Sequence, residues 1–185
     1  MTETRDLFGK KPKPKKKRPT KLESRLLKLD KNSFSGRLDR LKFIYKVYPK
    51  GLLLSGDMEF VFTFTEVKDC FISGHFIATI VLAQAFIEKI FRQLFIDNGQ
   101  QKEANEGLAS MIKFARKNKL INTLIIDKVD ELRLKRNPFT HTKDYNYSHT
   151  LQRRTLKNET QPNKQLENDA KDAIQILFLV LHNKL

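Results

Sequence analysis

The chain has 185 residues, with 36 Lys or Arg against 21 Asp or Glu, so its formal net charge is +15. A single cysteine excludes an intramolecular disulfide, and four scattered histidines give no zinc-finger spacing, so we expect no metal or other cofactor and a reducing, cytoplasmic setting. The first residues lack the layout of a secretory signal, and the longest uncharged run, residues 71–87, is short and contains polar side chains. This run predicts a buried helix and no membrane span.

The positive charge is concentrated near the N-terminus, since residues 1–50 hold 17 basic and 5 acidic side chains. Residues 1–20 include KKPKPKKKRP, in which like charges repel and prolines interrupt regular hydrogen bonding, so we expect a disordered basic arm. Residues 21–50 form the next part, a helical extension. Apolar residues at helical spacing predict two short helices there, at 21–30 and 36–49.

Residues 51–185 are expected to form the main domain. Phenylalanines at helical intervals predict a helix from Asp57, although three of them also alternate as in a short strand. Gly74 should separate this helix from a second one over 75–97, which is apolar on nearly every face and therefore belongs at the centre of a bundle.

Further helices are predicted over 104–118 and 121–136, and their very short connection favours antiparallel neighbours. The polar stretch 143–163 is expected to be a loop, and a last helix with a broad apolar stripe follows Pro162. The sequence therefore predicts an all-α fold: an antiparallel four- to five-helix bundle with additional N-terminal helices and the basic arm.

The segment RNPFTH, residues 136–141, holds residue types suited to RNA cleavage. Pro138 should end or restart the helix, which would let Arg136 and His141 converge on one pocket; on a continuous helix they would lie about 140° apart. An imidazole can move protons near neutral pH, and the forked guanidinium can hold a phosphate. The alternatives are an ordinary surface histidine and an arginine favoured by the helix C-terminal dipole.

The chain from about residue 57 resembles the HEPN superfamily of small helical bundles, many of which are ribonucleases. The resemblance rests first on RNPFTH, which is similar to the family signature of an arginine, a polar residue, a few variable positions and a histidine. It rests also on DCFISGHFIATIVLAQAFIEKIF (69–91), which is similar to the family's early helix pair with a glutamate, here Glu88, at its end. The order of the helices agrees as well.

This resemblance implies a homodimer with a composite, metal-independent endoribonuclease site. On that basis Arg136 binds the scissile phosphate, His141 transfers protons and Asn137 orients the pocket. Many such domains in bacteria are toxins or antiviral defence effectors, which implies a cognate antitoxin or a defence-system partner. Toxins of the family that are paired with nucleotidyltransferase antitoxins usually carry a tyrosine where this chain has Lys143, so control by modification of that tyrosine is not expected.

Two polar residues on the apolar central helix, Gln84 and Glu88, are candidates for supporting the site. A buried carboxylate needs a partner, and Arg136 is the candidate for Glu88; the alternative is that both polar groups reach solvent.

The cations expected to bind nucleic acid lie in the arm and beside the motif. The arm could also be a nuclear import signal or a solubilising tail. The residues expected to contact nucleic acid are Lys10, Lys11, Lys13, Lys15, Lys16, Lys17, Arg18, Lys135 and Lys143.

Two other functions compete with the ribonuclease. One is a non-catalytic nucleic-acid-binding or adaptor bundle, which the charge of the first 50 residues favours. The other is a regulator that uses the bundle only to form dimers.

Overall fold

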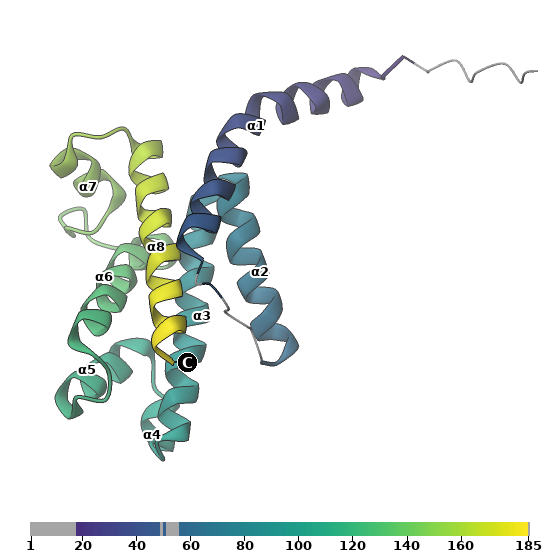
Figure 1. Cartoon of the computed structure of the whole chain (residues 1–185). Helices are drawn as coiled ribbons and strands as arrows, with labels where there is room; N and C mark the ends of the chain where they lie inside the picture. The colour runs from purple at the N-terminus through teal and green to yellow at the C-terminus, as the bar shows by residue number, and fades with distance from the viewer. Residues whose placement is uncertain (1–17, 49, 51–55, 185) are drawn as a thin grey trace, which may run out of the picture. The chain divides into compact units, whose positions relative to one another are not determined.

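The computed structural model describes residues 18–48, 50 and 56–184, and all regular secondary structure in these residues is helical (Figure 1). The all-α prediction is confirmed. The elements are α1 (Lys21–Val47), α2 (Met58–Ser73), α3 (Phe76–Asp97), α4 (Gln101–Ala104), α5 (Leu108–Asn118), α6 (Thr123–Thr140), α7 (Leu151–Asn158) and α8 (Pro162–Lys184).

The chain divides into two units, Met1–Ser35 and Gly36–Leu185. In the first unit all side chains of residues 18–35 are exposed, and residues 1–17 of the arm predicted over 1–20 lie outside the described residues. The second unit contains the whole hydrophobic core, including Ile44 of α1. The division therefore falls within α1.

The prediction of two short helices before residue 50 was wrong, because α1 is one continuous helix. It starts with a capping box, in which Glu23 N donates to Thr20 Oγ1 at 3.2 Å and Thr20 N donates to Glu23 Oε2 at 2.6 Å. Gly36 stands inside the helix, where a glycine costs only about 1 kcal/mol relative to alanine and so does not have to end it.

The second unit is built around α3, whose buried residues include Phe86, Ile87, Ile90 and Phe91. α3 packs against α8, α2 and α6, with α2 and α6 on opposite sides of it (Figure 1). The predicted central position of this helix is confirmed.

The turn between α2 and α3 depends on Gly74, which has φ +85°. Its backbone N–H points back to the carbonyls of Cys70 and Phe71, and a side chain here would be strained because of the left-handed backbone. The predicted helix from Asp57 is confirmed against the strand alternative, and Asp57 caps it by accepting from Phe60 N at 2.6 Å.

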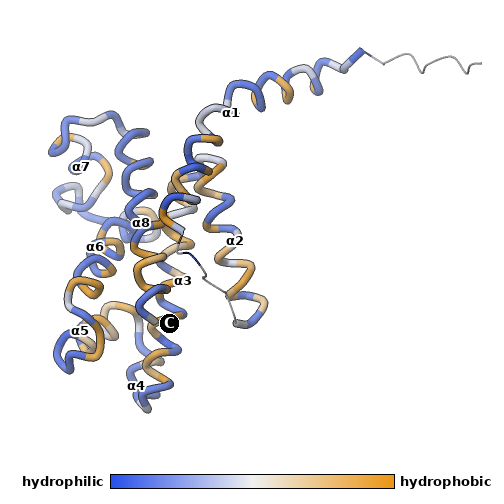
Figure 2. Tube along the Cα trace, in the orientation of Figure 1, coloured by the Kyte–Doolittle hydropathy of each residue, from blue (hydrophilic) through white to orange (hydrophobic). Residues whose placement is uncertain are grey.

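Two short helices were not predicted. α4 precedes α5, and α7 lies within the stretch 143–163 that was expected to be a loop. Figure 2 shows that α7 and its surroundings are mostly hydrophilic, so apolar periodicity gives no signal for this helix.

Candidate functional site at the end of α6

The RNPFTH segment forms the last turns of α6, which runs through Pro138 to Thr140 without the predicted break. Proline removes one helical donor and its ring crowds the carbonyl of residue 134, but only two helical residues follow it, so few hydrogen bonds depend on that position. The predicted helix break at Pro138 was therefore wrong, while the convergence of Arg136 and His141 stays a prediction. His141 is the C-cap, with extended backbone angles (φ −139°, ψ 137°), so the helical period does not fix its direction.

Arg136 lies partly buried near this end of α6. Its Nε is inaccessible to solvent and has no hydrogen-bond partner. Within the described residues no carboxylate lies within ion-pair distance of its guanidinium, whereas Arg133, one turn earlier, pairs with Asp130 at 2.7 Å. Arg136 therefore carries a charge that the described part of the chain does not neutralise.

His141 is exposed just beyond the helix. Its backbone N–H donates to the carbonyl of Asn137 at 2.9 Å, which fixes the position of the cap relative to the last turn. Five residues of α-helix span about 7.5 Å along the axis, so the backbones of Arg136 and His141 lie close together at this end of α6. The structure places Arg136 and His141 at the same helix end but joins them by no hydrogen bond.

The two supporting residues on α3 behave differently from each other. Glu88 forms an ion pair with Arg92 at 3.3 Å, one helical turn away, so its predicted pairing with Arg136 was wrong. Gln84 is buried, with 3% of its surface exposed, and its Oε1 has no partner among the described residues. Gln84 Oε1 on α3 and Arg136 Nε on α6 therefore both lack a hydrogen-bond partner among the described residues, and they are not bonded to each other.

The predicted nucleic-acid contacts also separate into groups. Lys143 is exposed, with its ammonium 5.7 Å from the ring centre of Tyr147, and Arg18 is exposed too. Lys135 is held by carboxylates at 2.8 Å (Glu131) and 3.1 Å (Asp172), so its charge is already balanced. Lys10, Lys11, Lys13, Lys15, Lys16 and Lys17 lie outside the described residues.

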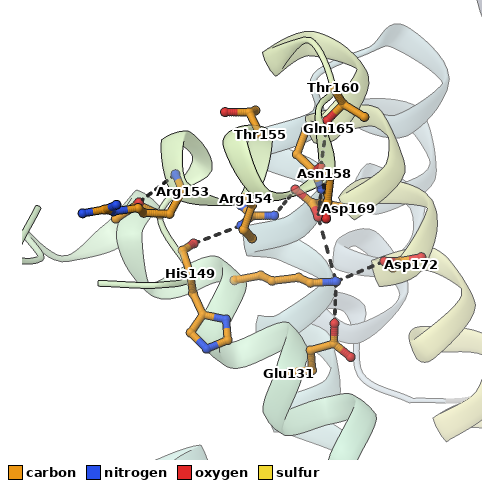
Figure 3. A network of polar contacts seen from close by, with 12 residues as sticks. Glu131, His149, Arg153, Arg154, Thr155, Asn158, Thr160, Gln165, Asp169 and Asp172 are labelled. Carbon is orange, nitrogen blue, oxygen red and sulfur yellow. Dashed lines mark hydrogen bonds and ion pairs between the residues drawn. The ribbon is translucent and has the colours of Figure 1, made fainter. Parts of the chain in front are cut away.

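A polar network at the junction of α6, α7 and α8 was not predicted from the sequence. Arg154 of α7 forms a buried ion pair with Asp169 of α8, and its Nε donates to the carbonyl of His149 at 3.0 Å (Figure 3). Gln165 donates to the other carboxylate oxygen of Asp169 at 3.0 Å. These contacts attach the polar α7 to the core.

The network shifts the pKa values of two groups beside it. Burial lowers the pKa of His149, and the charges of Arg154, Lys135 and Lys157 lower it further, against the opposing effect of Glu131. Burial alone would lower the pKa of Lys135, but its hydrogen bonds and charges with Glu131 and Asp172 raise it above the ordinary value.

A cavity of about 720 Å³ lies against this network. Its charged walls combine Lys135, Arg154 and Lys157 with three carboxylates, those of Glu131, Asp169 and Asp172. Positive and negative side chains are therefore equal in number in its walls, so the cavity has no clear preference for an anion.

Comparison with known proteins gives no relative: no family model, no curated protein and no solved structure matches the chain. In the described part of the chain, no helix is both long and apolar enough to cross a bilayer. The same residues contain no group of three or more His, Cys, Asp or Glu side chains placed to hold a metal ion.

Proposed function

We propose that this protein is a metal-independent endoribonuclease of the HEPN type, which acts as a homodimeric toxin or antiviral defence effector. The observation that carries the proposal is Arg136, a partly buried guanidinium without an acidic partner among the described residues, at the helix end that also carries the exposed imidazole of His141. A partly buried guanidinium without an acidic partner is suited to bind an external anion. We take this anion to be an RNA phosphate, because the imidazole of His141 could then transfer the protons that cleavage requires.

The proposed reaction is a transesterification that requires no metal. An imidazole takes the proton of the ribose 2′-hydroxyl, the 2′-oxygen forms a bond to phosphorus, and the bond between phosphorus and the 5′-oxygen breaks. The leaving 5′-oxygen receives a proton from an imidazolium, so the products are a 2′,3′-cyclic phosphate and a 5′-hydroxyl. In a dimer the histidines of the two subunits supply the base and the acid.

Arg136 acts on the phosphate in this scheme. Its planar, permanently charged guanidinium donates to the nonbridging oxygens, where negative charge increases in the pentacoordinate state. Asn137, the next residue, fixes the position of the His141 backbone through its carbonyl. Any residue at position 137 would offer this carbonyl, so the proposed role of the Asn137 side chain, to orient the pocket, rests on the resemblance to the HEPN signature.

The test is cleavage of single-stranded and structured RNA in EDTA, with analysis of the product ends. We expect His141→Ala to lower the rate by about 100- to 10,000-fold and Arg136→Ala by about 100- to 1,000-fold. Matched controls are His182→Ala, an exposed histidine on α8, and Arg133→Ala, an arginine that is paired with Asp130. If the wild type does not cut RNA, or if both site variants cut as fast as the wild type with unchanged circular dichroism, the enzymatic proposal is wrong.

The second candidate is a nucleic-acid-binding or adaptor bundle without catalysis. It is favoured by the 17 basic and 5 acidic residues of positions 1–50, since counterion release from a polyanion gives binding that depends on charge alone. In that case binding falls steeply with salt and with deletion of residues 1–20, while Arg136 and His141 are dispensable. Gel shifts with and without these residues separate the two candidates.

A further inference from the structure

An exposed tyrosine lies close to the proposed cleavage site, in the segment between α6 and α7. Tyr145 is 66% exposed, and the guanidinium carbon of Arg153 lies 5.0 Å from its ring centre. One face of the ring is therefore covered by an arginine of α7, and much of the rest is open to solvent. An aromatic ring backed by a cation is a favourable surface for stacking, because the cation attracts the π electrons and restricts the ring.

The backbone around Tyr145 is held in place by local hydrogen bonds. Asp144 accepts from Asn146 N at 2.7 Å through its side chain and from Tyr147 N at 3.0 Å through its carbonyl, which makes a compact turn. Arg153 donates to the Tyr145 carbonyl at 3.4 Å and to Asn146 Oδ1 at 2.5 Å. The same arginine thus fixes both the ring and the chain that carries it.

α7 connects this segment to the core. Figure 3 shows Arg153 and Arg154 on opposite sides of α7, with Arg154 directed toward Asp169 and Arg153 directed away from the network. Arg154 is tied to α8, and Arg153 is tied to the Tyr145 turn. Two consecutive arginines therefore give an exposed aromatic ring a defined position.

The position of Tyr145 relative to His141 is limited by the chain. The two residues are four positions apart, so their Cα atoms are at most about 14 Å apart, which a strand bound at His141 can span within a few nucleotides. Between the two lies Lys143, an exposed cation that can contact the backbone of the same strand.

We infer that Tyr145 is a stacking platform for an unpaired base of the RNA strand bound at His141, so that the substrate is single-stranded at this position. The inference rests on the proposed function for the identity of the site. Bases inside a duplex have both faces covered by their neighbours, whereas an unpaired base offers a free face to an aromatic side chain. Stacking does not read the base sequence, because every base has such a face.

Binding to an RNA that cannot be cut tests this inference separately from catalysis. The probe is a fluorescently labelled oligouridylate of eight nucleotides with 2′-O-methyl groups, which lacks the hydroxyl nucleophile; binding to the full chain is measured by anisotropy in EDTA. We expect Tyr145→Ala to weaken binding by about 5- to 150-fold, which corresponds to about 1–3 kcal/mol for one stacked base. Tyr145→Phe should bind within about twofold of the wild type because it keeps the ring.

The chain offers a matched control and a direct optical readout. Tyr45 on α1 is 77% exposed and lies outside the proposed site, so Tyr45→Ala should leave binding unchanged. The protein has no tryptophan, so Tyr145→Trp introduces the sole one. Its fluorescence should be quenched by the oligouridylate and not by an abasic strand of the same length.

Several outcomes would overturn the inference. Equal binding by Tyr145→Ala and the wild type would remove the stacking role, and equal losses on the normal and abasic strands would assign the effect to charge or loop geometry. A changed oligomeric mass in Tyr145→Ala, with RNA binding intact, would make the ring part of a protein interface. Binding that depends on the ring, without any cleavage, would support the stacking role and contradict the ribonuclease proposal. Cleavage that does not depend on Tyr145 would support the ribonuclease proposal and contradict the stacking role.

Discussion

Arg154 and Arg136 each have a side-chain nitrogen that is buried and lacks a hydrogen-bond partner, yet the regions around them differ. Arg154 is bound to Asp169, with side-chain exposures of 7% and 1%, and also donates to the carbonyl of His149. Arg136 has no carboxylate within ion-pair distance among the described residues. Arg154 therefore takes part in the contacts that hold the fold together, whereas Arg136 keeps a charge that our proposal assigns to an RNA phosphate.

The largest effect is expected from removing the partner of Arg154. Asp169→Ala leaves a buried guanidinium without its counterion, so we expect the free energy of unfolding to fall by about 3–5 kcal/mol. Urea denaturation measures this loss. The double variant Arg154→Met with Asp169→Leu should recover most of it, because two apolar side chains leave no unpaired charge. A loss below about 1 kcal/mol for Asp169→Ala would show that the network does not hold α7 to the core.

Lys135 touches the edge of the Arg154 network, with its ammonium 3.9 Å from Asp169, and should show an intermediate effect. Its two closest partners, Glu131 and Asp172, are about half exposed, so solvent screens these ion pairs, and Asp169 keeps Arg154 when the lysine is removed. Lys135→Met should therefore lower the free energy of unfolding by about 1 kcal/mol at low salt and by less at high salt. A loss as large as that of Asp169→Ala would show that the network depends on Lys135 as strongly as on Asp169.

Arg136→Met should scarcely change stability, by at most about 0.5 kcal/mol, because no partner among the described residues is left unsatisfied. The same variant should reduce the slope of log affinity for RNA against log salt by about 1, as expected for one lost phosphate contact. Arg133→Met is the matched control, since that arginine is paired with Asp130, and its salt slope should equal that of the wild type. Strong destabilisation by Arg136→Met, with unchanged salt dependence, would make Arg136 a second structural arginine.

The smallest effect concerns pH. Because burial and nearby cations lower the pKa of His149, the unfolded chain binds a proton there before the folded chain does. Stability is therefore lost as the pH falls through about 6.5, the value for an unperturbed histidine, and the loss is complete below the lowered folded pKa. The wild type should lose more stability than His149→Gln between pH 7.5 and 5.5 in urea denaturation. Identical losses would place His149 outside the influence of the Arg154 network.

The helices that depend on apolar periodicity could be predicted from the sequence. α2, α3 and α8 follow their apolar stripes. Gly74 marks the α2–α3 turn, because glycine adopts the left-handed backbone of this turn without steric strain. α7 could not be predicted, since its position depends on the Arg154–Asp169 contact over 15 residues of chain. Local sequence does not reveal such a pairing.

For the candidate site, the assignment of Arg136 and His141 stays a prediction, and the local geometry of the helix that carries them was not predicted. Arg136 and His141 were identified from their chemistry and spacing, whereas the continuation of α6 through Pro138 depends on how little helix follows the proline. The partner of Glu88 was mispredicted because Arg92, one turn away on the same helix, satisfies it first. No local sequence motif marks Tyr145 as a stacking residue, because the position of its ring depends on the contact with Arg153 of α7.

The eight residues of α7 pack mainly on α8, and few apolar side chains contribute to this contact. A segment of this kind can open in a local transition well before the bundle melts. Warming should then release the turn that carries Tyr145 while the helical content of the bundle persists. RNA binding would disappear at a lower temperature than the circular dichroism signal. The difference between the two midpoint temperatures would measure the stability of the α7 contact relative to that of the whole bundle.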